Sequence, residues 1–309
     1  MPRTSRTRMK LFAKHINALK QPLLQEADLA SCFLLAMHDA GDLEDTETIA
    51  PSEFRQDYRR FRNDLIDFGG IRPYPETDQG NASGYLVGLA DQMTPEQEVC
   101  SLDPFCYISH LSAMSWHGLT QRLPKSTFIT RPSKDLWRTL SHSRLQKRLG
   151  DLMPLYEQIG FPSYRPLDAD KVGGSRLHAW SSKRLDKGYS ASFKYAEERK
   201  VRVATLGRCF LDMVRKPDLC GGINHVMDVF DEHASDHINA ILTELDTHGN
   251  AVEQARVGYL LEQADPEAAY NPVLERWASK VSRGGSRKLD PSEDYSDIYS
   301  EKWALSINA

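Results

Sequence analysis

Three arginines at helical spacing form the first group of residues that could do chemistry. Arg55, Arg59 and Arg62 recur at steps of three and four residues, which places them along one side of a helix. A guanidinium group presents its donors in a fixed fork that fits phosphate oxygens and the edge of guanine. The pattern therefore favours a surface that binds nucleic acid.

A second group could hold a metal ion or move protons. His110 and His117 lie seven positions apart, which is about two helical turns, and Asp212 could join them. However, the chain contains no HExxH, CxxC, GxSxG or phosphate-loop spacing. We therefore interpret both histidines as packing or capping residues, and we expect no enzyme activity, metal or cofactor.

The three arginines require a helix between Pro51 and Gly69. Proline suits the first turn of a helix, and the pair Gly69 and Gly70 ends it. The side opposite the arginines is apolar and should be buried. It consists of Phe54, Tyr58, Phe61, Leu65 and Phe68.

The neighbours of this helix predict a known DNA-binding arrangement. Helices are expected over residues 8–19 and 22–40, and two short strands over residues 71–75 and 84–89. A basic helix closed by glycine and followed by a hairpin has the order of a winged helix-turn-helix, in which the helix enters the major groove and the hairpin lies along the backbone. The alternative is a solvated amphipathic helix beside an incidental hairpin, and Glu76 and Asp78 make this hairpin a poor phosphate clamp.

Charge is distributed unevenly along the chain. The formal net charge is -4, but residues 1–20 carry six bases and no acid, and acids dominate after Asp218. The sequence pattern of this basic arm requires no particular secondary structure, and such an arm can contact phosphates. The alternative is a disordered terminus that only increases solubility. The predicted DNA-contacting residues are Arg3, Arg6, Arg8 and Lys10 in the arm and Arg55, Arg59, Arg60, Arg62 and Arg72 in the helix and hairpin.

Length and composition predict a two-domain cytoplasmic protein. The 309 residues exceed the usual size of one core, and a polar stretch over residues 89–103 suggests a linker. We place the domains at residues 1–92 and 93–309. The five cysteines form no CxxC pair, no apolar run could span a bilayer, and the N-terminus does not resemble a secretory signal.

The second domain should mix helices and strands. A helix is expected over residues 107–120 and a strand over residues 127–130. Residues 201–223 read as a strand, a helix and a Cys-Gly-Gly hinge, followed by another helix. The predicted class is therefore α+β, with an N-terminal winged helix-turn-helix domain followed by a larger mixed α/β domain.

Two motifs in this second part resemble the AbiEi antitoxin family of abortive-infection systems. The first motif of that family is matched by Ser112, Ala113, His117, Gly118 and Leu119, and the second by Arg208, Asp212, Pro217, Cys220, Gly221 and Gly222. The sequence departs from the second motif at Gly207 and Cys209, where the family has glutamate and threonine. The resemblance covers roughly residues 103–263, including a similar closing helix over residues 255–262.

The resemblance implies an antitoxin that also represses its own transcription. Its winged helix would bind inverted repeats in double-stranded DNA at its own promoter. Its second domain would counter a nucleotidyltransferase-type toxin without a stable direct complex, and no membrane partner is implied.

A nucleic-acid-processing enzyme, such as a nuclease, is the alternative function. The basic middle segment, residues 121–200, would then be its substrate channel. Such an enzyme needs acids that converge on a metal ion, and only Asp168 and Asp170 lie close together in this segment. A pure protein-interaction module is a third possibility, which DNA binding by the N-terminal part would exclude.

Overall fold

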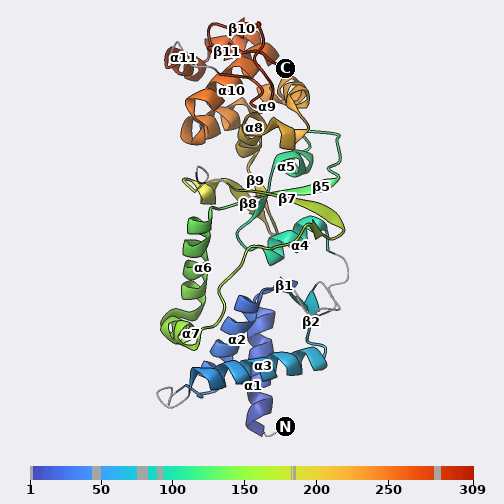
Figure 1. The fold of residues 1–309 in the computed structure, drawn as a ribbon, viewed down its shortest axis with the longest axis vertical. Coiled ribbons are helices and arrows are strands. Elements are labelled where there is room, and N and C mark those ends of the chain that lie inside the picture. Colours follow the sequence, from blue (N-terminus) through green and yellow to red (C-terminus); the bar gives the residue numbers. More distant parts are fainter. Residues whose placement is uncertain are drawn as a thin grey trace. The chain divides into compact units, whose positions relative to one another are not determined.

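The chain forms two compact units, each of which contains helices and strands (Figure 1). The computed structural model describes residues 3–43, 50–74, 83–88, 93–181, 183, 186–281 and 287–309, with side chains from Arg6 onward. Unit 1 comprises Met1–Phe105 and Ser133–Gly174, and unit 2 comprises Cys106–Pro132 and Ser175–Ala309. The predicted α+β class is confirmed at this level.

Unit 1 begins with three helices and a small antiparallel sheet. Strand β3 pairs with β1 on one side and with β2 on the other, so the strand order is β1-β3-β2. The predicted helices and hairpin are present, but residues 23–24 of the expected second helix form a strand instead. The elements are α1 (Arg3–Ala18), β1 (Leu23–Leu24), α2 (Glu26–Asp39), α3 (Pro51–Asp67), β2 (Ile71–Tyr74) and β3 (Gly84–Val87).

Aromatic rings hold these three helices together. Phe33 of α2 lies edge-on to Phe12 of α1, with ring centroids 6.0 Å apart. It also contacts Tyr58 and Phe61 of α3, at 5.6 and 5.8 Å. All four side chains are buried, and such ring pairs contribute about 0.5–1.5 kcal/mol each beyond their burial. The apolar side of α3 is therefore buried as its sequence predicted, except at Phe68, which is exposed.

The segment predicted to be a linker contains a helix. Helix α4 (Pro95–Leu102) begins with a capping box, in which the Thr94 hydroxyl accepts a hydrogen bond from the Gln97 backbone and the Gln97 side chain accepts one from the Thr94 backbone. This Thr-x-x-Gln spacing is a sequence signal for the start of a helix. The prediction of a linker took account of the polar composition of the segment and not of this signal. Leu102 then packs so close to β3 that a Cβ atom on Gly84 would lie 2.5 Å from its side chain.

A later stretch of the chain returns to unit 1, so the units divide the chain differently from the predicted boundary at residue 92. Helices α6 (Lys134–Leu149) and α7 (Met153–Ile159), joined by the short turn Gly150–Leu152, add Trp137, Leu145 and Tyr156 to the core that contains α1, α2 and α3. The short strand β6 (Lys171–Val172) ends this segment. Long-range burial of this kind leaves no local signal in the sequence.

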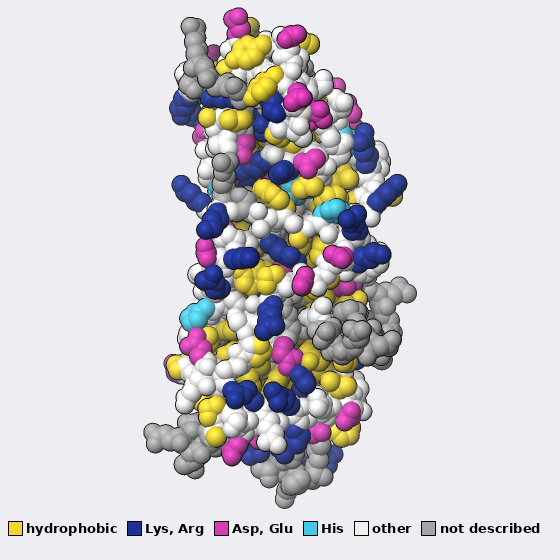
Figure 2. Space-filling view, viewed as in Figure 1, with side chains coloured by type: hydrophobic (Ala, Val, Ile, Leu, Met, Phe, Trp, Pro, Cys, Tyr) yellow, Lys and Arg dark blue, Asp and Glu magenta, His cyan; other side chains and the backbone are white. Residues whose placement is uncertain are grey.

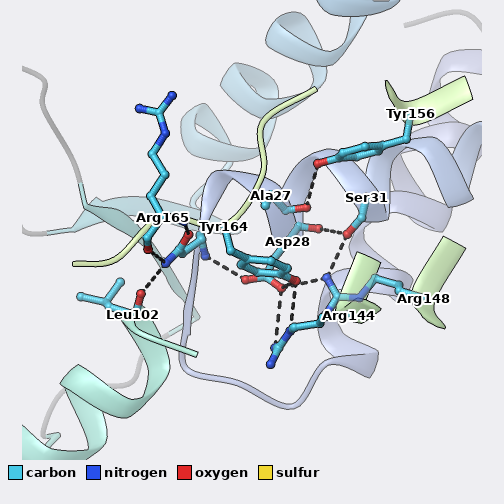
Figure 3. Close-up of polar contacts among 10 residues, drawn as sticks. Ala27, Asp28, Ser31, Leu102, Arg144, Arg148, Tyr156, Tyr164 and Arg165 are labelled. Atoms are coloured by element: carbon cyan, nitrogen blue, oxygen red, sulfur yellow. Dashed lines mark hydrogen bonds and ion pairs between the residues drawn. The ribbon is translucent and has the colours of Figure 1, made fainter. Parts of the chain in front are cut away.

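Asp28, at the start of α2, joins these distant segments through its buried carboxylate (Figure 3). One of its oxygens accepts hydrogen bonds from Arg148 of α6 at 2.8 Å and from Tyr164, beyond α7, at 2.7 Å. The other oxygen accepts the backbone N–H of Gln25 at 3.0 Å. Arg148 also donates to Ser31 at 2.9 Å. A buried carboxylate is stable only with such partners, so the network fixes α6 and the segment after α7 to α2.

Unit 2 is built on a mixed sheet covered by helices. Strands β5 and β7 are parallel, as are β4 and β9, whereas β4 with β5 and β8 with β9 are antiparallel. The strands, in the order β7-β5-β4-β9-β8, are Ser175–Ser181, Ser126–Arg131, Tyr107–Ile108, Val201–Ala204 and Phe193–Ala196. The helices are α5 (His110–Trp116), α8 (Leu206–Arg215), α9 (Ile223–His248), α10 (Ala251–Ala264) and α11 (Pro272–Ser279).

Unit 2 differs from the sequence-based prediction in one helix and agrees with it around the glycine hinge. The helix expected over residues 107–120 is shorter, because Tyr107 and Ile108 pair with Thr130 and Ile129 as strand β4. The strand, helix and glycine hinge over residues 201–223 are confirmed, and Gly221 and Gly222 have φ angles of 94° and 91°. A short hairpin of β10 (Tyr299–Ser300) and β11 (Leu305–Ser306) lies near the C-terminus. No helix in the described ranges is long and apolar enough to cross a lipid bilayer.

The Asp28 network predicts a large loss of stability when its charge is removed. Asp28→Asn keeps the size of the side chain but leaves Arg148 without its counter-charge, so we expect the free energy of unfolding to fall by about 3 kcal/mol. Urea titration followed by circular dichroism measures this. The control is Asp135→Asn on the exposed pair with Arg138 (side chains 63% and 79% exposed), which should change stability by less than about 0.5 kcal/mol. Equal effects of the two variants would contradict the assigned role.

Candidate nucleic-acid interface

Helix α3 presents a polar face to solvent along its whole length. It begins with Pro51 in its first turn and ends at Asp67, two residues before Gly69, whose φ angle is 70°. Because the apolar residues face α2, the exposed residues lie on the other side of the helix: Ser52, Glu53, Arg55, Gln56, Arg59, Arg60, Asn63 and Asp67. On the face drawn in Figure 2, Lys and Arg side chains occur over most of the surface, and in the region where α3 lies in Figure 1 Asp and Glu side chains lie among them.

Arg55 is used inside unit 1. Its guanidinium group donates a 2.5 Å hydrogen bond to the carbonyl oxygen of Ile159, the last residue of α7. The last carbonyls of a helix carry partial negative charge and lack partners within the helix, so a cation there is favourable. Arg55 therefore holds the end of α7 beside α3 and is less available to a ligand than its spacing suggested.

Arg62 is also engaged inside unit 1. It donates a 2.8 Å hydrogen bond to the carboxylate of Glu26, which also accepts the Tyr58 hydroxyl at 2.6 Å. Its guanidinium group lies 5.8 Å from the ring centroid of Tyr58 and 5.9 Å from that of Tyr85. Burial alone would lower the pKa of Arg62, but Glu26, Tyr85 and Tyr58 together outweigh that effect and raise it. The side chain is thus a fixed, charged part of the core boundary.

Arg59 and Arg60 remain directed away from the core. Both are exposed, and Arg59 makes no hydrogen bond or ion pair with any other described residue. Arg60 pairs with Asp57 at 2.9 Å and lies over the Phe61 ring at 5.6 Å. Exposed pairs one turn apart contribute only about 0.3–0.5 kcal/mol, so Arg60 can exchange this partner for a phosphate at little cost.

The N-terminal segment is helical rather than an arm without structure. The backbone of Arg3 lies in α1, and its side chain falls outside the described residues. Arg8 is paired with Asp42, which leaves Arg6 and Lys10 as exposed cations on one side of α1. Lys14 is exposed on the same side, one turn further along α1. It is not among the predicted DNA-contacting residues, although its helical spacing from Lys10 indicates that the two lie on one side.

The hairpin contributes Arg72, which is exposed on strand β2. Its neighbour Tyr74 hydrogen-bonds Glu98 of α4, and burial together with Glu98 raises the pKa of Tyr74 to about 12. Glu76 and Asp78, the acids that weaken the wing as a phosphate clamp, lie outside the described residues. Of the nine predicted contact residues, the structure leaves Arg6, Lys10, Arg55, Arg59, Arg60 and Arg72 exposed with described side chains, and Arg55 is held by the Ile159 carbonyl.

The histidines and the aspartate of the possible metal group serve different roles. The Nδ1 atom of His110 lies 2.7 Å from the Ser109 hydroxyl, and burial lowers the pKa of His110 to about 3, so its ring is neutral. The Nε2 atom of His117 lies 2.8 Å from the carbonyl oxygen of Ala204 on β9. Within the described part of the chain, no three His, Cys, Asp or Glu side chains are placed to hold a metal ion.

Asp212 is fully buried and lies in a group of buried and half-buried charges on α8, α9 and α10. Arg208 of α8 is 3.2 Å from Glu244 of α9 and also donates to the Ser192 hydroxyl. Arg215 binds Glu253 of α10 at 2.7 Å. Neither carboxylate oxygen of Asp212 accepts a hydrogen bond from another described residue. Burial therefore raises the pKa of Asp212 to about 6, although Arg208 and Arg215 act in the opposite direction.

Gly207 precedes this group, and its surroundings have no room for a side chain. A Cβ atom at Gly207 would lie 2.5 Å from the carbonyl oxygen of Ala240 and 2.9 Å from the side chain of Glu244. Real Cβ atoms essentially never approach backbone so closely, so a glutamate here would force α8 and α9 apart. Glycine thus permits the close crossing of these two helices. Cys209, the other departure from the family motif, is fully buried, which raises the pKa of its thiol.

Comparisons with known proteins include a distant structural match. No family model matches the chain, and no curated protein matches it. The crystal structure of the RV2827C protein from Mycobacterium tuberculosis superposes with a TM-score of 0.45 at 12% sequence identity, over 97% of this chain and 90% of that chain.

The buried Asp212 carboxyl predicts a pH-dependent stability. Its folded pKa of about 6 lies above its ordinary value near 4, so the folded state binds its proton more tightly than the unfolded state. The stabilisation is complete below about pH 4 and is lost as the pH rises through 6. A shift of this size corresponds to roughly 3 kcal/mol.

Asp212→Asn removes this titration and tests the assignment. Free energies of unfolding should be measured for wild type and variant at several pH values between 4 and 7.5. The wild type should lose stability relative to the variant over this range, because only the wild type must ionise a buried carboxyl. Parallel curves would show that Asp212 is already ionised in the folded protein at low pH.

Proposed function

We propose that this chain is a DNA-binding regulator whose first helices and small sheet form a winged helix-turn-helix. The observation that carries the proposal is the element order α1-β1-α2-α3-β2-β3 with strand order β1-β3-β2. In this arrangement α3 is the recognition helix and the β2–β3 hairpin is the wing. A helix fits the major groove of B-form DNA, and the exposed side of α3 carries Arg59 and Arg60 among polar side chains, with Glu53 and Asp67 near its two ends.

Charge supports double-stranded DNA as the partner. Arg6 and Lys10 add exposed cations on α1, and Arg72 adds one on the hairpin. Neutralising phosphates releases condensed counterions, which makes each such contact favourable although the whole chain has a formal charge of -4. The proposed target is DNA at the chain's own promoter, with inverted repeats.

We further propose an antitoxin role, which rests on the motif resemblance in unit 2. The residues that carry it are Ser112, Ala113, His117, Gly118 and Leu119 and the second set from Arg208 to Gly222. His117 contacts the carbonyl oxygen of Ala204, and Arg208 pairs with Glu244. Both motif residues therefore stabilise the fold of unit 2, which supports a structural role for the motif in a binding domain. The proposed partner is a nucleotidyltransferase-type toxin, opposed without a stable complex.

The DNA-binding proposal predicts which arginines matter and how. Arg59→Ala should weaken binding of the full chain to its upstream DNA by about tenfold, because one base or phosphate contact contributes about 1–3 kcal/mol. Its melting temperature should not change, since Arg59 has no partner among the described residues. Arg55→Ala should instead lower the melting temperature, because it removes the hydrogen bond to Ile159. Fluorescence anisotropy and thermal melts measure both.

Arg138→Ala is the matched control for this experiment. Arg138 is an exposed arginine on α6 whose described partner is Asp135 at 3.3 Å. It should leave both DNA affinity and melting temperature unchanged. The proposal would be overturned if the full chain bound no duplex DNA, or if Arg59→Ala bound as tightly as wild type.

The antitoxin proposal predicts rescue of growth in cells. Co-expression of this chain with a nucleotidyltransferase-like protein encoded beside it should restore growth that the toxin alone arrests. Arg59→Ala should rescue growth as well as wild type when both are expressed from a foreign promoter, because neutralisation is assigned to unit 2. Rescue without co-purification is the expected pattern, and failure to rescue would refute the antitoxin role.

A further inference from the structure

We infer that Gln56, Arg59 and Asn63 of α3 form a base-reading row that prefers a guanine flanked by two adenines. The inference rests on the proposed DNA-binding function and assigns its sequence specificity to particular side chains. It differs from the sequence-based expectation, in which Arg55, Arg59 and Arg62 were the main contacts.

The side chains of this row are available to a ligand, whereas Arg55 and Arg62 are not. Arg55 is bound to the carbonyl of Ile159, and Arg62 is bound to Glu26 and lies between two tyrosine rings. Moving either into a groove would break contacts that hold α3 to the rest of unit 1. Gln56 and Arg59 are exposed and make no hydrogen bond with other described residues. Asn63 is exposed and accepts one long contact, 3.4 Å from Arg62.

The functional groups of this row match the hydrogen-bonding edges of particular bases. The amide groups of Gln and Asn each offer one donor and one acceptor, which match the N7 and N6 atoms of adenine in the major groove. The Arg59 guanidinium offers two parallel donors, which match O6 and N7 of guanine. Arg60 lies at the margin of the row beside Asp57, where a phosphate contact is the natural role.

The spacing of the three side chains along α3 matches the spacing of bases in the groove. Positions 56, 59 and 63 recur at steps of three and four residues, so their side chains leave the helix on one side. At about 1.5 Å per residue, the row from Gln56 to Asn63 is about 10 Å long. This length matches about three base-pair steps of 3.4 Å. The two adenines should therefore lie about three base pairs apart, with the guanine between them.

Selection from a pool of DNA duplexes with a randomised core tests the inference on the full chain. Wild type should enrich a core that contains the guanine and the two adenines. Arg59→Gln should change the preferred base at the central position from guanine to adenine. Asn63→Ala and Gln56→Ala should each relax one flanking position, lowering its discrimination by about fivefold to a hundredfold.

Matched controls separate this result from a general loss of affinity. Gln158→Ala on α7 and Arg138→Gln on α6 change exposed side chains of the same types, and they should leave the selected sequence unaltered. If the α3 variants lowered affinity equally for every duplex, the row would contact phosphates and the inference alone would fail. If wild type bound DNA with no sequence preference, it would fail in the same way. If wild type bound no duplex, the proposed function would fail with it.

Discussion

The buried carboxylate of Asp28 is the constraint on which unit 1 depends. A charge at 2% exposure is stable only when several donors surround it, and here the donors come from Gln25 just before α2, from α6 and from the segment after α7. Gln25, its neighbour in the chain, extends this effect. The Gln25 amide donates to the carbonyl oxygens of Leu102 and Arg165 and accepts the backbone N–H of Arg165. One end of α2 thus unites segments that lie more than a hundred residues apart in the sequence.

This arrangement also determines what α3 can offer a ligand. Because α7 is held in unit 1, the carbonyl of Ile159 lies where Arg55 can bind it. Because Glu26 begins α2, Arg62 has a carboxylate partner and two aromatic neighbours. Two arginines therefore stabilise the position of the helix, and the residues between them remain exposed. The same interactions that fix the helix select which of its polar side chains can contact DNA.

Unit 2 uses buried charge in a different way. Arg208, Asp212 and Arg215 lie on one ten-residue helix, and the two arginines pair with carboxylates from α9 and α10. Gly207 lets α8 approach α9 closely enough for Arg208 to reach Glu244. The two nearby arginines do not fully offset the burial of Asp212, so the pKa of its carboxyl group stays raised. Such a group ties the stability of unit 2 to pH more than an apolar core would.

The amino-acid sequence by itself determined the local elements. The apolar periodicity of Phe54, Tyr58 and Phe61 defined α3 and its buried side, and the glycines at 69 and 221 marked helix ends, because these signals depend on residues close together in the chain. Thr94 and Gln97 carried an equally local signal for α4. The order of the first six elements could therefore be predicted nearly in full, apart from the two-residue strand β1.

Only the tertiary structure decided which segments share a core and which arginines are free. Nothing near Asp28 in the sequence indicates Arg148 or Tyr164, and nothing near Arg55 indicates Ile159, since a hydrogen bond across a hundred residues requires the folded backbone to bring both partners together. Helical spacing treats Arg55, Arg59 and Arg62 alike. Packing distinguishes them, because the two outer arginines meet acceptors from α7 and α2 while Arg59 faces solvent.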